Sequence, residues 1–105
     1  MEEVNITIGS VTFDRADYDA ENDILYLNIG EPQEAEGETT PEGHHLRYAP
    51  GTYDIVGLTV LSPRRILEQD GHLAVTLAQT SKMSAEDLAT AFAAVETPAE
   101  ASRRR

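Results

Sequence analysis

The sequence predicts an α+β domain, with a small antiparallel sheet of about five strands in a hairpin-rich meander and one C-terminal helix. Three observations predict this class. Apolar and polar residues alternate over residues 24–29, as in a strand with one buried face. A Pro-Gly pair at residues 50–51 separates two β-rich runs, which is typical of a hairpin. Near the C-terminus, apolar residues recur at helical spacing, namely Leu88, Ala91, Phe92 and Val95.

The N-terminal part of the chain is expected to be β-structure. Residues 4–8 alternate, Gly9-Ser10 interrupts the alternation, and residues 11–13 resume it, which indicates one bulged strand or a tight hairpin. Residues 14–23 are rich in Asp and Asn, whose side chains bond nearby amides, and they predict a turn. In the strand that follows, Leu25, Leu27 and Ile29 share the expected core face, and Ile24, Tyr26 and Asn28 share the other.

The middle of the chain combines an acidic loop with a hairpin. Residues 30–43 carry five glutamates and no base, which predicts a mobile loop, although residues 34–39 could form a short edge strand. Residues 44–48 and 53–61 are predicted to pair through the turn at 49–52, with Val56, Leu58 and Val60 on one face. Gly57 lies inside that strand and indicates a bulge or a close approach by another backbone.

The C-terminal third is predicted to end in a helix. Pro63 ends the preceding strand, residues 64–68 form a helical turn or a short strand, and residues 73–77 form a last strand. A helix then begins at Ser84, with Glu86 and Asp87 in its first turn, and stops at Thr97-Pro98. Its apolar stripe is expected to face the core, and docking on a partner is the alternative. We therefore expect one domain over residues 1–97 and a disordered tail over residues 98–105.

Composition predicts the oligomeric state and the cellular compartment of the protein. The chain has 105 residues, 40% of them hydrophobic, and no cysteine. A core of this size gives marginal stability to a monomer, which favours a homodimer. The absence of cysteine favours a reducing compartment, and no apolar run approaches a membrane span. The acidic start Met1-Glu2-Glu3 differs from a signal peptide, so we expect a cytoplasmic protein.

Negative charge is concentrated in the first part of the chain. The net charge is −11, and residues 1–46 contain twelve acids with Arg15 as the only base, whereas residues 47–105 are balanced. Such a field repels nucleic acids and anionic membranes and attracts a basic partner. The basic end Arg103-Arg104-Arg105 could meet the acidic loop of a neighbouring copy, or touch nucleic acid weakly.

Three segments together resemble a known family. Residues 18–27 read YDAENDILYL, residues 42–48 read EGHHLRY, and residues 54–61 read DIVGLTVL. This pattern, over residues 16–67, resembles the bacterial and archaeal family called domain of unknown function 2283. The chain departs from the family at Ala49-Pro50-Gly51, at Thr59 and at Ser62-Pro63, where the family has acids or an Ala-Ser ending. The resemblance implies the strand-and-turn fold and no established activity, and some relatives look like partners of small toxin-like proteins.

No catalytic motif is apparent. His44, His45 and His72 are the only imidazoles, and adjacent strand residues point to opposite faces, so His44 and His45 cannot share one ion. One of them with His72 and a carboxylate could bind a metal. The acids of residues 14–23 lack the glycine and the final acid of a calcium loop and are interpreted as solvated turn residues. The serines lack a nucleophile elbow, so we predict a protein that is not an enzyme and has no cofactor.

The function predicted from these features is a non-enzymatic protein-interaction module. It would self-associate or bind a partner through a sheet edge and the acidic loop. Glu34, Glu36 and Glu38 would supply charge, and Tyr26 and Tyr48 contact area. One alternative is an antitoxin-like partner that neutralises a small basic toxin, and another is a metal-dependent enzyme that uses His45 and a carboxylate.

Overall fold

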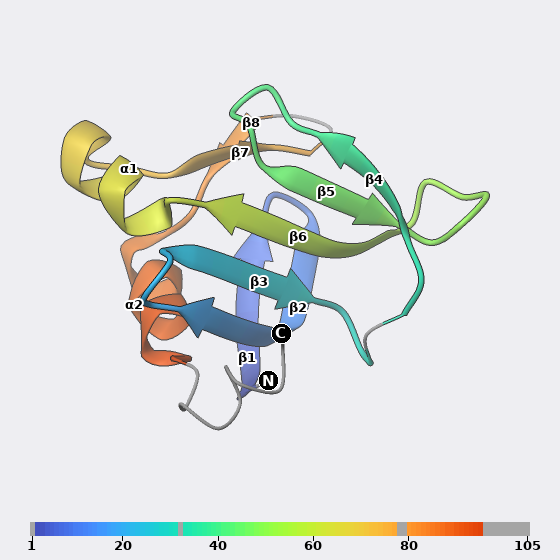
Figure 1. The fold of residues 1–105 in the computed structure, drawn as a ribbon, viewed down its shortest axis with the longest axis horizontal. Helices are drawn as coiled ribbons and strands as arrows, with labels where there is room; N and C mark the ends of the chain where they lie inside the picture. The colour runs from blue at the N-terminus through green and yellow to red at the C-terminus, as the bar shows by residue number, and fades with distance from the viewer. Residues whose placement is uncertain (1, 32, 78–79, 96–105) are drawn as a thin grey trace.

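The computed structural model describes residues 2–31, 33–77 and 80–95 (Figure 1). The C-terminal helix ends at Ala93, so the predicted stop at Thr97-Pro98 is wrong; that pair and the predicted tail, with Arg103 to Arg105, lie outside the described residues. Along the chain the elements are β1 Glu2–Ile8, β2 Val11–Asp19, β3 Ile24–Asn28, β4 Glu36–Thr39, β5 His45–Tyr48, β6 Ile55–Leu61, α1 Pro63–Asp70, β7 Ala74–Thr76, β8 Thr80–Lys82 and α2 Ala85–Ala93.

Six strands form one antiparallel sheet in the order β1-β2-β3-β6-β5-β4, and β7 pairs with β8 in a second sheet. The predicted α+β class with a C-terminal helix is confirmed. The large sheet has six strands in the described part of the chain, close to the predicted five, and α1 realises the first of the two alternatives for residues 64–68. The meander is interrupted, since β3 pairs with β6 and the chain after β3 reaches the far edge to begin β4 (Figure 1).

The N-terminal residues form the tight hairpin, one of the two predicted alternatives. Gly9 has a φ of 60° in its turn, a conformation that glycine adopts without steric cost. The strand β2 continues to Asp19, so the predicted turn over residues 14–23 is wrong for its first six residues. Ala16 and Tyr18 are buried in the core, whereas Asp17 lies on the other face. The buried residues Phe13, Ala16 and Tyr18 are spaced by three and then by two, so this strand lacks a simple period-two alternation, and the aspartates between them are typical of turns.

The core lies on one face of the large sheet. Leu27, Leu58 and Leu46 face one another in register across β3, β6 and β5, and all three are buried. Leu25 is likewise fully buried, so the predicted inward face of residues 24–28 is confirmed. Val56 departs from the prediction because the β5–β6 register shifts beside it, and its side chain is only half-buried.

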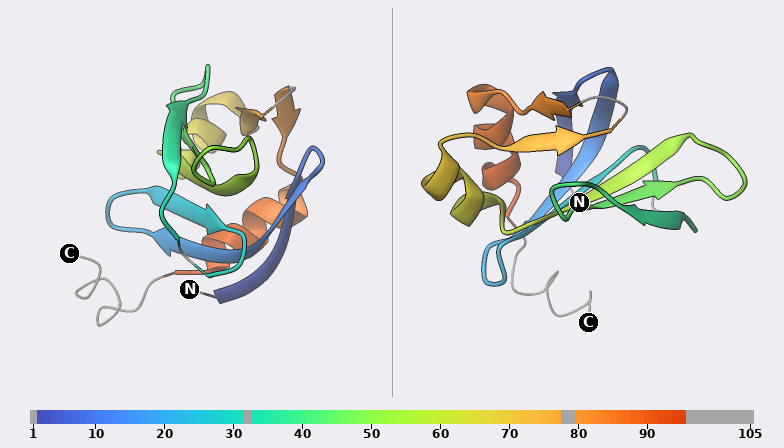
Figure 2. Two further views of the ribbon diagram at one scale, coloured as in Figure 1. Left: turned by 90° about the vertical axis from the view of Figure 1, so that its right-hand side faces the viewer. Right: turned by 90° about the horizontal axis from the view of Figure 1, so that it is seen from above.

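The helix α2 and the β7–β8 pair cover the same face of the sheet (Figure 2). The predicted start of α2 is confirmed, since the Ser84 hydroxyl accepts a 3.0 Å hydrogen bond from the Asp87 amide. Leu88 and Ala91 are buried and Phe92 packs against the core as predicted. Val95 lies beyond the helix and is 44% exposed, so its predicted core position is wrong.

The helix α1 begins on an acid from a different part of the chain. Ser62, its N-cap residue, has a φ of 54° and makes no capping bond. The Asp23 carboxylate, in the β2–β3 turn, instead accepts from the amides of Arg64 and Arg65 at 3.1 and 3.2 Å. The same carboxylate accepts from the Tyr18 hydroxyl at 2.7 Å. This acid therefore fixes α1 to the end of the sheet, as an N-cap supplied from outside the helix.

The Arg64 side chain completes this junction. Its guanidinium carbon lies 4.6 Å from the centre of the Phe92 ring, and its Nε donates to the Tyr18 hydroxyl at 3.3 Å. The Tyr18 and Phe92 rings meet edge to face at 5.0 Å. The pKa of Tyr18 is raised, first by burial and then by Asp23, against an opposing effect of Arg64. The β2–β3 turn, α1 and α2 are thus joined around one tyrosine.

Candidate functional site

The strand β4 forms one edge of the large sheet (Figure 1). All four of its residues, Glu36 to Thr39, are exposed. Within the described residues β4 pairs only with β5, so its outward amides and carbonyls have no strand partner. An exposed edge of this kind is a template for an added strand. Residues 36–39 thus form the short edge strand that was the alternative to the predicted mobile loop.

One face of this edge brings together acids and tyrosines. Glu36 pairs with Tyr48 and Glu38 with Leu46, which places both glutamates on the face of the sheet that carries the core. The Tyr48 hydroxyl donates to the Glu38 carboxylate at 2.9 Å. Burial and then this carboxylate raise the pKa of Tyr48. Edge, charge and aromatic surface are therefore combined on one side of β4.

A shallow pocket adjoins these residues. Its volume is about 70 Å³, and it lies between the β4–β5 hairpin and the end of β7. Tyr53, in the loop before β6, adds aromatic surface nearby, because its ring meets Tyr48 edge to face at 6.4 Å and is 94% exposed. The residues that line the pocket are Glu38, Thr39, Thr40, Pro41, Leu46, Tyr48, Thr76 and Leu77.

The predicted partner-binding residues do not all meet. Glu36, Glu38 and Tyr48 lie together, and Glu34 is exposed just before β4. Tyr26 lies in β3, paired with Asp17 and Thr59, on the opposite face of the sheet. Sequence reasoning missed Tyr53, which was expected in a strand but lies in the loop before Ile55. No pattern in the sequence distinguishes it from a strand tyrosine.

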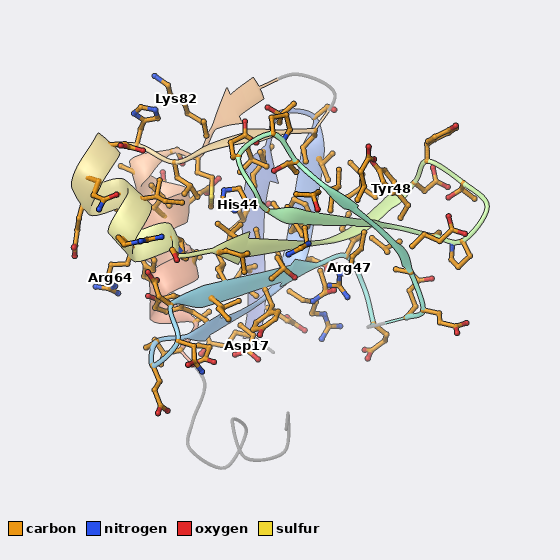
Figure 3. All side chains as sticks on the ribbon, turned by 45° about the horizontal axis from the view of Figure 1, so that its top comes forward. Asp17, His44, Arg47, Tyr48, Arg64 and Lys82 are labelled. Atoms are coloured by element: carbon orange, nitrogen blue, oxygen red, sulfur yellow. The ribbon has the colours of Figure 1, made fainter. Side chains whose placement is uncertain are left out.

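The opposite face of the same edge is open at Gly37. Gly37 pairs with Arg47, and a side chain added at Gly37 would meet nothing within 4 Å. The Arg47 guanidinium is turned away from it, over Gly57, where its Nη2 donates to the Asn28 side chain. Gly57 is thus approached by a side chain and not by another backbone, while the predicted bulge does occur next to it. Arg47 and Tyr48 point to opposite sides of the sheet (Figure 3).

Glu42 secures the hairpin that carries β4. Its carboxylate accepts from the Thr76 amide at 2.9 Å and from the Thr76 hydroxyl at 2.6 Å. Burial acts to raise the pKa of Glu42, but these hydrogen bonds outweigh it and the pKa is lowered. Glu42 therefore links the β4–β5 turn to β7. Its carboxylate has a structural role and is not counted among the free acids of the loop.

The three histidines occupy separate environments. His44 is 1% exposed, whereas His45 is exposed on β5, in agreement with the prediction that they face opposite ways. His72 is exposed, with its Nδ1 3.1 Å from the Asp70 carbonyl oxygen. Within residues 2–31, 33–77 and 80–95, no three His, Asp or Glu side chains are grouped to hold a metal ion.

The acids of residues 14–23 have structural roles that the interpretation as solvated turn residues missed. Asp14 accepts from the Gly30 amide at 2.8 Å, and Asp19 accepts from Asn22 within the turn. Asp17 is 5% exposed on the outer face of the sheet, and Asp23 caps α1. The bonds between Asp19 and Asn22 are those of a simple turn. The interpretation is wrong for Asp17, which is buried, and for Asp23, which caps a helix.

We expect stability to fall below about pH 6.5 because of His44. Its Nδ1 accepts from the Leu61 amide at 3.1 Å, which requires the neutral ring. Burial lowers the pKa of His44, Glu42 partly opposes this, and His45 adds to it. Since the folded state binds the proton less readily than the unfolded chain, the unfolding free energy decreases as the pH drops from about 6.5 towards the folded pKa. The decrease reaches at most about 1.4 kcal/mol per pH unit for this one group.

Urea denaturation at a series of pH values measures this dependence. His44→Gln should flatten the part of the curve below about pH 6.5. His72→Gln, at an exposed histidine that has no part in the pKa shift of His44, is the matched control and should leave the slope as it is in the unmodified chain. Equal slopes for the unmodified chain and His44→Gln would show that another group is responsible.

The fold and site together define a small α+β domain with an acidic, tyrosine-bearing sheet edge. No protein-family model, curated protein or solved structure matches the chain. The similarity to the domain of unknown function 2283 family therefore stays a prediction. No helix in the described part of the chain has the length and apolar character needed to span a membrane.

Proposed function

We propose that this protein is a non-enzymatic protein-interaction module that accepts an extended strand of a basic partner at β4. The observation that carries the proposal is the fully exposed edge strand with Glu36 and Glu38 on one face. Main-chain hydrogen bonds supply affinity in strand addition, and side chains at alternate positions supply specificity.

The charge of the edge favours a basic strand. Glu34 and Glu36 make no hydrogen bond or ion pair with the rest of the described chain, and Glu38 interacts only with Tyr48. Opposite charges facing each other on adjacent strands are stabilising by roughly 0.2 to 1 kcal/mol per pair. The concentration of acids in residues 1–46 adds long-range attraction, which speeds the encounter with a cationic protein.

Pairing of β4 with β4 of a second copy is less favourable. Directly opposed residues of two antiparallel strands share a face of the sheet. In a symmetric pair of β4 strands, the two-fold axis must therefore lie beside one residue, which is then opposed to its own copy. An axis at Gly37 opposes Glu36 to the partner's Glu38, and an axis at Glu38 opposes that residue to itself. Like charges directly opposite are destabilising. If the protein is a homodimer, we expect another surface to form it.

The neutralising partner of a small basic toxin is a specific form of the same function. Its support is the excess of negative charge together with the exposed edge. A bound strand of the toxin would be covered on its basic side by Glu36 and Glu38, with Tyr48 and Tyr53 beside them.

A short synthetic peptide that alternates lysine and valine tests strand addition directly. We expect hydrogen exchange at the amides of residues 36–39 to slow when the peptide is added, as monitored by NMR. Glu36→Lys together with Glu38→Lys should weaken the peptide affinity about tenfold, because two attractive pairs become repulsive. Added salt should weaken binding to the unmodified chain.

The matched control carries the same charge change at the other edge of the sheet. Glu2→Lys with Glu3→Lys alters two exposed residues of β1 and should change the peptide affinity less than about twofold. If both double variants weaken binding equally, net charge and not the β4 edge attracts the peptide. If the β4 amides are never protected, strand addition is refuted.

A further inference from the structure

The two faces of β4 differ in a way that specifies the sequence of the added strand. On one face, Glu36 and Glu38 are two residues apart and project beside Tyr48. On the other face, between them in sequence, Gly37 leaves the space above its backbone open. Because a strand's side chains alternate between faces, an added strand meets both features at successive positions.

We propose that the strand accepted by β4 carries the pattern basic, aromatic, basic at three consecutive residues. This inference rests on the proposed function, since it requires strand addition at β4. The two basic residues face Glu36 and Glu38, and the aromatic residue faces Gly37. The partner is thus identified by a local pattern and not only by an overall positive charge.

The acidic face selects the basic positions. Residues directly opposite on antiparallel strands have Cβ atoms about 4.5 to 5.5 Å apart, and diagonal neighbours remain within reach of long side chains. A basic residue opposite Glu38 is therefore also close to Glu36, and the next basic residue on that face is close to both. The pocket beside Glu38 is lined by Leu46 and Leu77, which offer apolar surface for the stem of a lysine or arginine.

The open space above Gly37 favours an aromatic residue at the middle position of the added strand. Gly37 exposes its backbone with no neighbouring atom in the space that a side chain would occupy. A cross-strand aromatic ring covers such a glycine and shields the main-chain hydrogen bonds beneath it. Arg47, across from Gly37, directs its guanidinium over Gly57 to Asn28, so the charged group is turned away from the open space above Gly37.

Two synthetic peptides of identical composition test the pattern. One presents lysine, tyrosine and lysine in that order within a serine and threonine frame, and the other presents tyrosine, lysine and lysine. Only the first can face both lysines to Glu36 and Glu38 while the ring covers Gly37. Titration followed by NMR should show that the first peptide binds the unmodified chain about three- to tenfold more tightly.

A variant at Gly37 separates the requirement for an aromatic residue from the requirement for basic residues. Gly37→Val fills the space without strain, because the backbone at Gly37 does not have a positive φ. A third peptide presents lysine, serine and lysine in the same frame, and Gly37→Val should abolish the preference for the first peptide over this one, which is the preference for tyrosine over serine at the middle position. Thr39→Val, on the same face of β4, is the control and should retain that preference.

The outcomes distinguish the pattern from strand addition itself. Equal affinities of the two peptides, with the β4 amides protected by both, would overturn the pattern and leave the proposed function standing. If neither peptide protects the β4 amides from hydrogen exchange, both the pattern and the proposed function are overturned. A preference that survives Gly37→Val would show that the tyrosine binds elsewhere, which also overturns the assignment of the aromatic position.

Discussion

Replacing Leu58 with alanine is expected to lower the free energy of unfolding by about 3 kcal/mol. Leu58 is fully buried and lies between Leu27 and Leu46 in the middle of the sheet. Both neighbours belong to strands held in register by main-chain hydrogen bonds, which limits how far the site can collapse around the cavity. A domain of this size has a total stability of roughly 5 to 15 kcal/mol, so the loss is a large fraction.

Thermal unfolding followed by circular dichroism measures the effect. A loss of about 3 kcal/mol lowers the Tm by roughly 12 to 24 °C in a domain of about this length. Val56→Ala is the matched control on the same strand, because Val56 is half-buried beside the bulge, and its cost should stay below about 1.5 kcal/mol. A Leu58→Ala cost no greater than that of Val56→Ala would contradict the assigned inward face of β6.

Replacing Asp23 with alanine is expected to cost about 2 to 3 kcal/mol, although this residue lies in a turn. The substitution leaves the amides of Arg64 and Arg65 and the Tyr18 hydroxyl without their acceptor. Loss of an N-cap costs about 0.5 to 2 kcal/mol, and a buried donor left unsatisfied costs about 1 to 3 kcal/mol. Alanine is also strained at the φ of 55° that Asp23 adopts.

Three further variants divide this cost among its causes. Asp23→Asn keeps an acceptor oxygen and tolerates the positive φ, so it should lose less than half as much. Tyr18→Phe removes the hydroxyl's bond to Asp23 and the bond it accepts from Arg64, and should cost about 1 to 2 kcal/mol. Glu21→Ala, at an exposed position of the same turn, should change stability by less than about 0.5 kcal/mol. Urea denaturation gives each value, and a neutral Asp23→Ala would rule out the cap.

Local patterns predicted much of the sheet. Alternation over residues 24–29 predicted β3, and the β-rich run over residues 53–61 predicted β6, because one face of each strand is buried and the side-chain period is two. The Ser84 cap and the apolar stripe predicted α2. The strand β2 was partly missed because its outer face carries Asp17 and Asp19, and local composition there resembles a turn.

The candidate site was predicted only in part from local patterns. Glu36 and Glu38 were expected in an acidic loop, with an edge strand as the alternative, and they lie on the edge strand β4 beside Tyr48. Tyr26 was grouped with them because of its residue type, but it lies on the opposite face of a central strand. Which residues share a face across strands depends on register and strand order, and neither is encoded in any short window of sequence.

The sequence by itself determined the α+β class, the strands with one apolar face, the C-terminal helix and the acidic character of residues 30–43, because each follows from the order of neighbouring residues. Tertiary structure alone decided that β3 pairs with β6, that β4 lies at the edge, and that Asp23 caps a helix more than 40 residues along the chain. These contacts join distant segments, and they form because the only way to bury the apolar faces together is to bring those segments side by side.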